Sequence, residues 1–274
     1  MTEGRELNKW LTHIDWWSML PPGRPPQTQL QFIRSHLRGA ENVLILGSTP
    51  EYRDLCVEER VGSVHVIDYS ESFHRHVSAQ RVYTDATEAV TFARWQDYLP
   101  TLKSRFDVIL GDLVSGNVDY PARADFYSSI AKALRRNGRF IERVLTNREG
   151  YQRLKHLDQY YRRAPLNLLT VNNFANEYFF TSEIVEQGGI VDVREIVAIL
   201  SDRYRHDRRL QAVLAMTAQV VPADGVWFYG RPWETVERHY GGLFSIEGTH
   251  MDSKRDRFMR RIETFIFSPR RTRW

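Results

Sequence analysis

The sequence predicts an α/β protein of the Rossmann-like type, with a seven-stranded, mostly parallel sheet covered by helices on both faces. Short apolar runs alternate with helix-like stretches between residues 41 and 147, which is typical of parallel strands buried on both sides. Glycine or aspartate directly follows several of these runs, where such sheets bind their ligands. A long helical stretch then precedes two further strand-like runs that close the sheet.

The predicted elements alternate in order along the chain. The first five strands lie in NVLILG (42–47), SVHVIDYS (63–70), AVTFARWQDY (89–98), FDVILGDLVSG (106–116) and RFIERVLTN (139–147). Helices are expected in TPEYRDLCVEERV (49–61), ESFHRHVSAQR (71–81) and DFYSSIAKALRRNG (125–138), the last closed by Gly138. The closing strands are LFSIEGTH (243–250) and IETFIFSP (262–269).

Four segments follow from this pattern. Residues 1–40, rich in tryptophan and interrupted by LPPGRPP, are expected to form an N-terminal helical lid. Residues 41–147 form the core. Residues 148–242 contain four helix-like stretches and are expected to be an insertion between strands five and six on the substrate side. Residues 243–274 supply the closing strands.

Composition limits the class of protein. The 274 residues include 42% hydrophobic and 26% charged residues, as in ordinary globular proteins. Cys56 is the single cysteine, which excludes an internal disulfide and a cysteine-rich zinc site. No apolar run approaches the ~20 residues of a membrane span, and the charged N-terminus does not look like a secretion signal. We therefore expect a cytoplasmic protein.

The spacing between Gly47 and Asp68 points to a nucleoside. A glycine turn followed ~20 residues later by an acid at a strand end lets a carboxylate accept hydrogen bonds from ribose hydroxyls. Pro50 removes an N–H from the helix start, and Glu51 would repel a phosphate. The turn thus suits a ribonucleoside that carries positive charge and no phosphate, which describes S-adenosylmethionine.

The same residues resemble the class I S-adenosylmethionine-dependent methyltransferases. VLILGSTPEYRDL stands at the first motif of that family, VHVIDYSESF at the second, TFARWQDY at the third, FDVILGDLVSG at the fourth and ALRRNGRFIERV before strand five. The first motif lacks two of the usual glycines, Arg94 stands where an acid is common, and Asn137 replaces a proline.

The resemblance implies a set of cofactor-binding residues. Gly47 makes the turn, Asp68 takes the ribose, and Tyr69, Trp95 and Gln96 lie where the adenine packs, with Asp97 as an alternative. Ser48 and Thr49 would bind the amino-acid end of the donor, Glu51 suits its positive charge, and Asp112 points toward the methyl-transfer site.

Catalytic groups are harder to find, because methyl transfer needs a base only when the acceptor must lose a proton. Asp112 and His239 are the candidates. No metal site is expected, and we take His74 and His76 of HRH as surface residues. The turn after strand four lacks the Asn/Asp-Pro-Pro-aromatic pattern of amine methyltransferases of nucleic acids, and no cysteine nucleophile follows it.

These exclusions leave a small-molecule or peptide acceptor, of which we expect a small molecule, and no membrane partner. The net charge of +4 is modest and gathers in KRDRFMRR and SPRRTRW, which we interpret as a solvated surface, so nucleic acid is not expected. A homodimer is compatible with this interpretation. Three alternatives stay open: an RNA or tRNA methyltransferase using that basic end, a non-catalytic nucleoside-binding partner protein, and a short-chain NAD(P) oxidoreductase, although Tyr127 lacks the lysine that the last would need.

Overall fold

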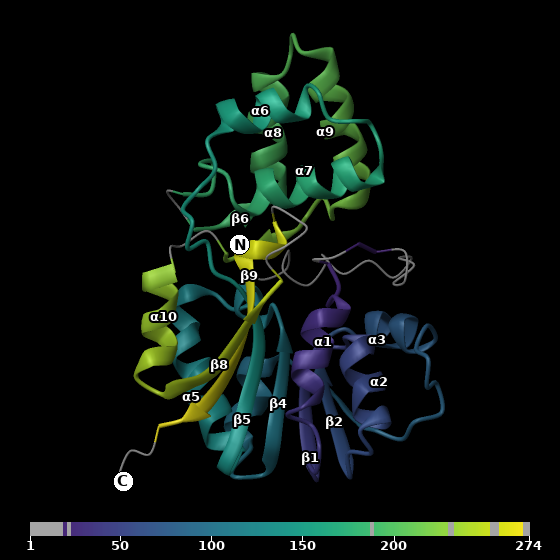
Figure 1. The fold of residues 1–274 in the computed structure, drawn as a ribbon, viewed down its shortest axis with the longest axis vertical. Helices are drawn as coiled ribbons and strands as arrows, with labels where there is room; N and C mark the ends of the chain where they lie inside the picture. The colour runs from purple at the N-terminus through teal and green to yellow at the C-terminus, as the bar shows by residue number, and fades with distance from the viewer. Residues whose placement is uncertain (1–18, 21–22, 187–188, 230–232, 253–257, 271–274) are drawn as a thin grey trace. The chain divides into compact units, whose positions relative to one another are not determined.

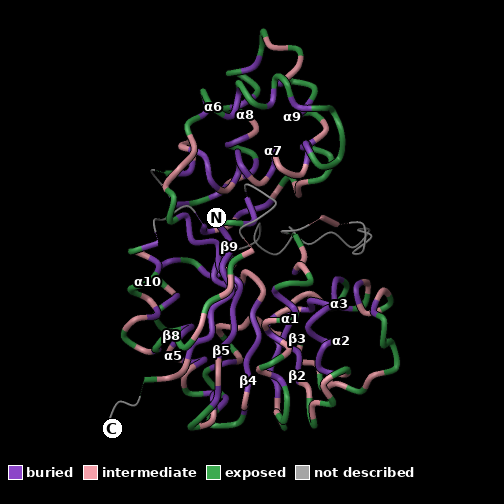
Figure 2. Tube along the Cα trace, in the orientation of Figure 1, coloured by how far each residue is buried: buried purple, intermediate pink, exposed green. Residues whose placement is uncertain are grey.

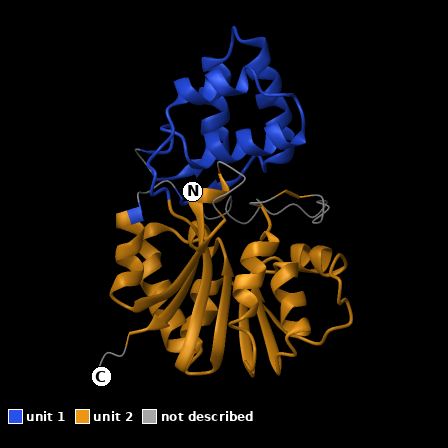
Figure 3. Cartoon of the chain, in the orientation of Figure 1, with its two compact units in different colours: residues 1–11, 147–233 blue, residues 12–146, 234–274 orange. Residues whose placement is uncertain are grey.

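The computed structural model describes residues 19–20, 23–186, 189–229, 233–252 and 258–270. The chain divides into two compact units (Figure 3). One holds the large sheet and its helices, and the other contains the residues Asn147–Trp233. We describe each unit by itself.

The first unit is built on a seven-stranded sheet in the order β3-β2-β1-β4-β5-β9-β8 (Figure 1). Neighbouring strands from β3 to β5 are parallel, and β9 is antiparallel to both β5 and β8. The predicted fold class, with two closing strands at one edge, is confirmed. The strands are β1 (Asn42–Leu46), β2 (Ser63–Asp68), β3 (Ala89–Phe92), β4 (Phe106–Asp112), β5 (Leu134–Leu145), β8 (Phe244–Met251) and β9 (Ile262–Pro269).

Helices cover both faces of this sheet, as its apolar strands require. On one face, α1 and α2 bury Leu30, Ile33 and Leu55 against β1, β2, β4 and β9. On the other face, Tyr127 of α5 and Tyr240 of α10 pack against the aromatic residues of β5 and β9. Figure 2 shows the resulting buried centre. The helices of this unit are α1 (Gln27–Arg34), α2 (Pro50–Glu58), α3 (Glu71–Ser78), α4 (Trp95–Tyr98), α5 (Arg123–Ala133) and α10 (Trp233–Gly241), with 3₁₀ turns at Leu99–Thr101, Val114–Asn117, Tyr120–Ala122 and Met259–Arg261.

The end of α5 differs from the prediction. The helix stops at Ala133 and does not continue to Gly138, because Leu134 turns to an extended conformation and pairs with Phe106 of β4. Gly138 lies inside β5, where a Cβ would come within 2.9 Å of the Phe106 carbonyl oxygen. Its role is therefore the close approach of two strands, and the helix needs no glycine to end.

The second unit has its own hydrophobic core. Helices α6 (Leu154–Tyr161), α7 (Leu168–Phe180), α8 (Val193–Arg203) and α9 (Arg208–Val220) accompany a two-stranded sheet of β6 (Val191–Asp192) and β7 (Val226–Trp227). Phe174, Tyr178 and Leu210 are among its buried side chains. Asp158 is also buried and accepts hydrogen bonds from the hydroxyls of Tyr178 (2.8 Å) and Tyr204 (2.6 Å).

Two segment boundaries shift in the structure. The second unit ends at Trp233, so most of α10, which we placed in the insertion, groups with the large sheet; the Tyr240 ring stacks on Phe267 at a centroid distance of 4.6 Å. Helix α1, placed in the lid, contributes to the core of the first unit. Residues 1–18 of the predicted lid lie outside the described residues. None of the described helices combines the length and the apolar composition needed to cross a membrane.

Candidate functional site

The carboxyl ends of β1, β2 and β4 lie side by side at one edge of the sheet. Leu46 is in register with Ile67 of β2 on one side and with Gly111 of β4 on the other. The strand order reverses at β1, which is the switch point where open α/β sheets bind their ligands. The turn after β1 therefore lies between Asp68 and Asp112.

This turn depends on Gly47. Its φ of +90° lies in the region that side chains rarely adopt, and its N–H donates to the Ile67 carbonyl oxygen at 2.8 Å. A Cβ at Gly47 would meet only the Trp95 ring, at an ordinary contact of 3.7 Å. The glycine is required by the backbone conformation, and the neighbouring space would accept a methyl group.

Asp68 ends β2 with its side chain buried and held at both oxygens. The Ser48 hydroxyl lies 2.6 Å from Oδ2, and the Ser70 N–H donates to Oδ1 at 2.9 Å. Burial raises the pKa of Asp68, and the hydrogen bonds from Ser48 and from the backbone oppose that rise. A carboxylate has about four acceptor sites, so Asp68 keeps the capacity to accept from a ribose hydroxyl beyond its hydrogen bonds from Ser48 and from the backbone of Tyr69 and Ser70.

Trp95 lies directly beside the turn. It opens α4, its indole N–H donates to the Ile67 carbonyl oxygen at 2.9 Å, and its ring is half-buried. Tyr69 and Gln96 are also half-buried, next to Asp68 and to Trp95 in the chain, whereas Asp97 is exposed. The indole ring thus lies beside the turn after β1 and the backbone of β2 one residue before Asp68.

Asp112, at the end of β4, is part of a buried ion pair. The Arg143 guanidinium of β5 lies 2.6 Å from its Oδ1, and the Arg143 side chain is fully buried. Burial raises the pKa of Asp112, while Arg143 and a hydrogen bond from Thr49 act in the opposite direction. Thr49 and Asp112 are therefore brought together, and the carboxylate is fixed in place.

Glu51, in the first turn of α2, is also buried and paired. The Nε of Arg24 lies 2.7 Å from its Oε1, and only 4% of the Glu51 side chain is exposed. The negative charge that we expected to face a cationic ligand is thus already partly balanced by Arg24, which sequence reasoning did not include.

His239 lies two residues before the end of α10 and is half-buried. The helix leads into β8, whose first residue, Phe244, pairs with Pro269 at the end of β9. Because β9 is antiparallel to β5, this end of β9 lies toward the amino edge of the sheet. The geometry therefore gives no support to His239 as a base beside Asp112.

Next to His239, Tyr240 belongs to a buried polar cluster that sequence reasoning missed. Its hydroxyl lies 3.1 Å from Oε2 of Glu142 and 2.8 Å from the Tyr127 hydroxyl. The Ser115 N–H donates to Glu142 Oε1 at 2.8 Å. Burial raises the pKa of Glu142 to about 7. The sequence signal was the adjacent charged pair Glu142-Arg143 inside an apolar strand, where charges must find partners.

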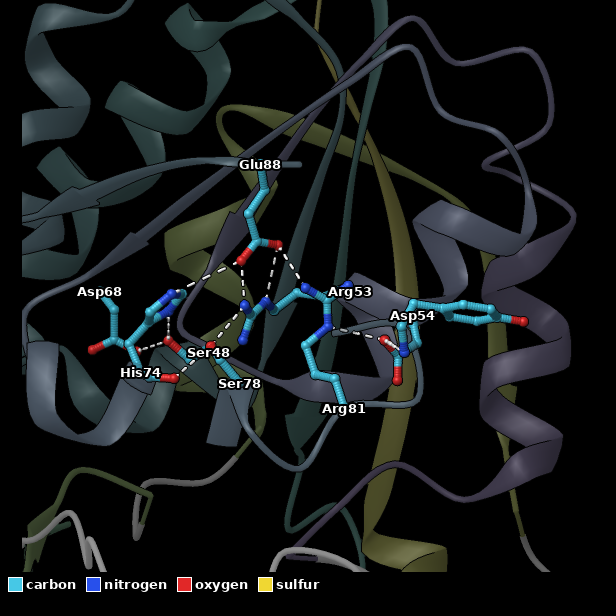
Figure 4. A network of polar contacts seen from close by, with 9 residues as sticks. Ser48, Arg53, Asp54, Asp68, His74, Ser78, Arg81 and Glu88 are labelled. Atoms are coloured by element: carbon cyan, nitrogen blue, oxygen red, sulfur yellow. Dashed lines mark hydrogen bonds and ion pairs between the residues drawn. The ribbon is translucent and has the colours of Figure 1, made fainter. Parts of the chain in front are cut away.

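His74 corrects a second expectation. We predicted a surface residue, but α3 turns its ring inward, and only 7% of the residue is exposed. Its Nδ1 lies 2.9 Å from the Ser48 hydroxyl oxygen, and Figure 4 shows it between Ser48 and the ion pairs around Glu88. Burial, followed by the neighbouring charge of Arg53, lowers the pKa of His74 to about 4. The ring is therefore neutral at neutral pH.

Among the residues that the structure describes, no group of three or more His, Cys, Asp or Glu side chains could hold a metal ion. Cys56 is buried in α2, and burial raises the pKa of its thiol to about 12. Much of the basic C-terminal sequence, at 253–257 and 271–274, lies outside the described residues.

The chain matches no protein-family model and no curated protein sequence. Similar folds do occur among solved structures. A protein of Rhodobacter sphaeroides, described as a candidate zinc-dependent alcohol dehydrogenase, aligns with a TM-score of 0.64 and 15% identity over 98% of this chain and 100% of its own. A Methanosarcina mazei structure described as an S-adenosylmethionine-dependent methyltransferase aligns with a TM-score of 0.51 and 13% identity, over 86% of this chain and 94% of its own.

A Pyrococcus horikoshii protein aligns with a TM-score of 0.53 and 11% identity, over 96% of this chain and 95% of its own. At these identities the likenesses establish the fold. Together with the strand order, they confirm that the chain has the Rossmann-like fold seen in class I methyltransferases.

Proposed function

We propose that this protein is an S-adenosylmethionine-dependent methyltransferase that acts on a small-molecule acceptor. The observation that carries the proposal is the convergence of Gly47, Asp68, Trp95 and Asp112 at the switch point of the sheet. Three separate segments supply a tight turn, a ribose acid and an aromatic ring, and the turn contacts both of the others through Ser48 to Asp68 and Gly47 to Trp95. This is the set of groups that an adenosine-containing ligand without a phosphate needs.

In this assignment each group has one task. Asp68 accepts from the ribose hydroxyls, and Trp95 packs against the adenine. Thr49 and Asp112 lie at the β4 side of the turn, where the fixed carboxylate would receive the ammonium of the donor. When bound, S-adenosylmethionine supplies a methyl group on a sulfonium, which an acceptor nucleophile takes by in-line displacement.

Acceleration then comes largely from holding the two reactants in line. Asp112 is paired with Arg143 and is assigned to the ammonium, so it is not also proposed as the base that an acceptor with a proton to lose would need. The residues after β4, Leu113–Asn117, lack the motif that amine methyltransferases of nucleic acids use. This supports a small-molecule acceptor.

The candidate dehydrogenase among the similar structures makes a nicotinamide cofactor the competing function. Three observations weigh against it. Pro50 opens α2 and withholds an N–H from any pyrophosphate, Glu51 is buried in the same turn, and the described residues contain no cluster of zinc ligands.

Calorimetry separates the two ligands. We expect S-adenosylhomocysteine and S-adenosylmethionine to bind, and Asp68→Ala to weaken both by about ten-fold or more, because hydrogen bonds to a charged group are lost. Asp202→Ala is the matched control, since Asp202 is an 80% exposed carboxylate on α8 that pairs with Arg205. Binding of NAD with no binding of either adenosyl ligand at about 1 mM would refute the proposal.

A further inference from the structure

Asp68, the proposed ribose acid, is held by Ser48 and, through Ser48, by His74. No sequence motif predicts this arrangement. Ser48 follows Gly47 directly, at a position that the G-x-G-x-x-G fingerprint of dinucleotide-binding turns leaves variable. Its hydroxyl lies 2.6 Å from Asp68 Oδ2 and 2.9 Å from His74 Nδ1. All three side chains are buried: Ser48 is 3%, Asp68 6% and His74 7% exposed. The three groups form one short chain of hydrogen bonds.

The proton positions in this chain follow from the chemistry of its ends. An ionised Asp68 can only accept, so the single Ser48 hydroxyl proton is directed to Asp68. The Ser48 oxygen must then accept from His74, which requires the neutral Nδ1–H tautomer. Burial lowers the pKa of His74 to about 4, in agreement with a neutral ring. The Nε2 atom, 3.8 Å from Glu88 Oε1, carries no proton in this tautomer, so that approach is not an ion pair at neutral pH.

His74 is itself fixed by a buried charge network (Figure 4). The Ser78 hydroxyl donates to the His74 carbonyl oxygen at 2.6 Å, and Arg53 donates to the Ser78 hydroxyl at 2.8 Å. Glu88 forms ion pairs with both Arg53 and Arg81.

Arg81 also pairs with Asp54 at 2.9 Å, so the two guanidiniums of the network face two carboxylates. His74 thus sits against an internally neutralised network that cannot move without breaking ion pairs. The Phe92 and His74 rings pack edge to face at a centroid distance of 5.5 Å.

We infer that Ser48 and His74 are positioning residues that fix the Asp68 carboxylate for the vicinal hydroxyls of a ribose. The inference rests on the proposed function, because it concerns the nucleoside end of the same site. His74 acts through Ser48 and does not touch the ligand.

The test compares binding of S-adenosylhomocysteine and of its 2′-deoxy analogue to matched variants. We expect Ser48→Ala and His74→Ala each to weaken binding of the ribose ligand by about five-fold to ten-fold, the effect of one hydrogen bond. The double variant should lose no more than either single one, because the two residues act in series. The loss should be smaller for the 2′-deoxy analogue, which lacks one of the hydroxyls that Asp68 receives.

Two conservative variants separate positioning from a merely structural role. His74→Asn keeps an N–H donor near the Nδ1 position and should restore affinity to within about two-fold of the wild type. His74→Gln places its amide near the Nε2 position and should not restore affinity. Thermal melting of each variant identifies those that remain folded. If His74→Ala is unfolded, the difference in affinity between His74→Asn and His74→Gln tests the positioning role.

The outcomes are distinct. Unchanged affinity in Ser48→Ala and His74→Gln, or equal losses for the ribose and 2′-deoxy ligands, would overturn the positioning role while leaving the proposed function intact. If the wild type binds NAD and not the adenosyl ligands, the methyltransferase proposal falls, and the same variants measured with NAD decide the positioning role. If it binds neither, both proposals are wrong.

Discussion

Replacing Glu142 with glutamine should change how stability depends on pH. Glu142 is completely buried in β5, accepts from the Ser115 N–H and contacts the Tyr240 hydroxyl. Tyr127 and Arg123 complete its surroundings, since Tyr127 contacts Tyr240 and Arg123 donates to the Ser115 carbonyl oxygen. Desolvation outweighs these favourable contacts and raises the pKa of Glu142 from 4.5 to about 7.

The sign follows from proton binding in the two states. The folded chain holds the Glu142 proton more tightly than the unfolded chain, so this contribution to stability is fully present below about pH 4.5. It is lost as pH rises toward 7. The difference between the two pKa values corresponds to about 3 kcal/mol. Glutamine does not titrate, so Glu142→Gln should gain about that much stability relative to the wild type between pH 4.5 and pH 8.

The measurement is urea denaturation of both proteins across this range, followed by tryptophan fluorescence. The difference between the two proteins is the informative quantity, because His74 titrates in the opposite sense. Its pKa falls from 6.5 to about 4 on folding, so stability from His74 is lost as pH drops through that interval. A wild-type-minus-variant difference that is flat, or that grows with pH, would refute the account of Glu142.

Two further predictions concern the turn and the buried ion pair. Gly47→Ala should lower the free energy of unfolding by about 1–2 kcal/mol through backbone strain alone, and it should weaken the binding of S-adenosylhomocysteine. Gly39→Ala is the control: Gly39 has a φ of +74° with open space around it. This variant should lose similar stability and leave the affinity measured by calorimetry unchanged. Arg143→Met should destabilise by about 3–5 kcal/mol because Asp112 is left as an uncompensated buried charge, and adding Asp112→Asn should recover most of that loss in thermal melting.

The parts of the structure that sequence could predict are those set by local pattern. Apolar runs ending in Gly47, Asp68 and Asp112 located the strand ends, because a parallel sheet buries both faces of its strands and leaves polar groups at the carboxyl edge. The end of α5 was misplaced by five residues. The chain leaves the helix at Leu134 because this residue pairs with Phe106 of β4, which is distant in sequence. Local pattern could not predict that pairing.

The partners of the site residues were not predictable from local pattern. His74 lies 26 positions after Ser48, and Arg143 lies 31 after Asp112. The local sequence around a helical histidine does not distinguish a ring that faces water from one that faces a buried hydroxyl. The register of β4 against β5 places Arg143 beside Asp112, and the packing of α3 places His74 beside Ser48. Both depend on the assembled fold.

Charge at the edge of the sheet now gives a firmer reason for the ligand than Glu51 alone did. Asp68, Asp112 and Glu51 supply three carboxylates, and Arg143 and Arg24 pair with two of them, so these five side chains carry one net negative charge when Asp68 is ionised. S-adenosylmethionine, with a sulfonium, an ammonium and one carboxylate, carries the opposite net charge, whereas a dinucleotide pyrophosphate would add negative charge beside Asp68. If the proposed function is correct, discrimination against phosphate comes from the sum of these charges together with the N–H that Pro50 withholds. High ionic strength should then weaken only the contribution of the exposed charges.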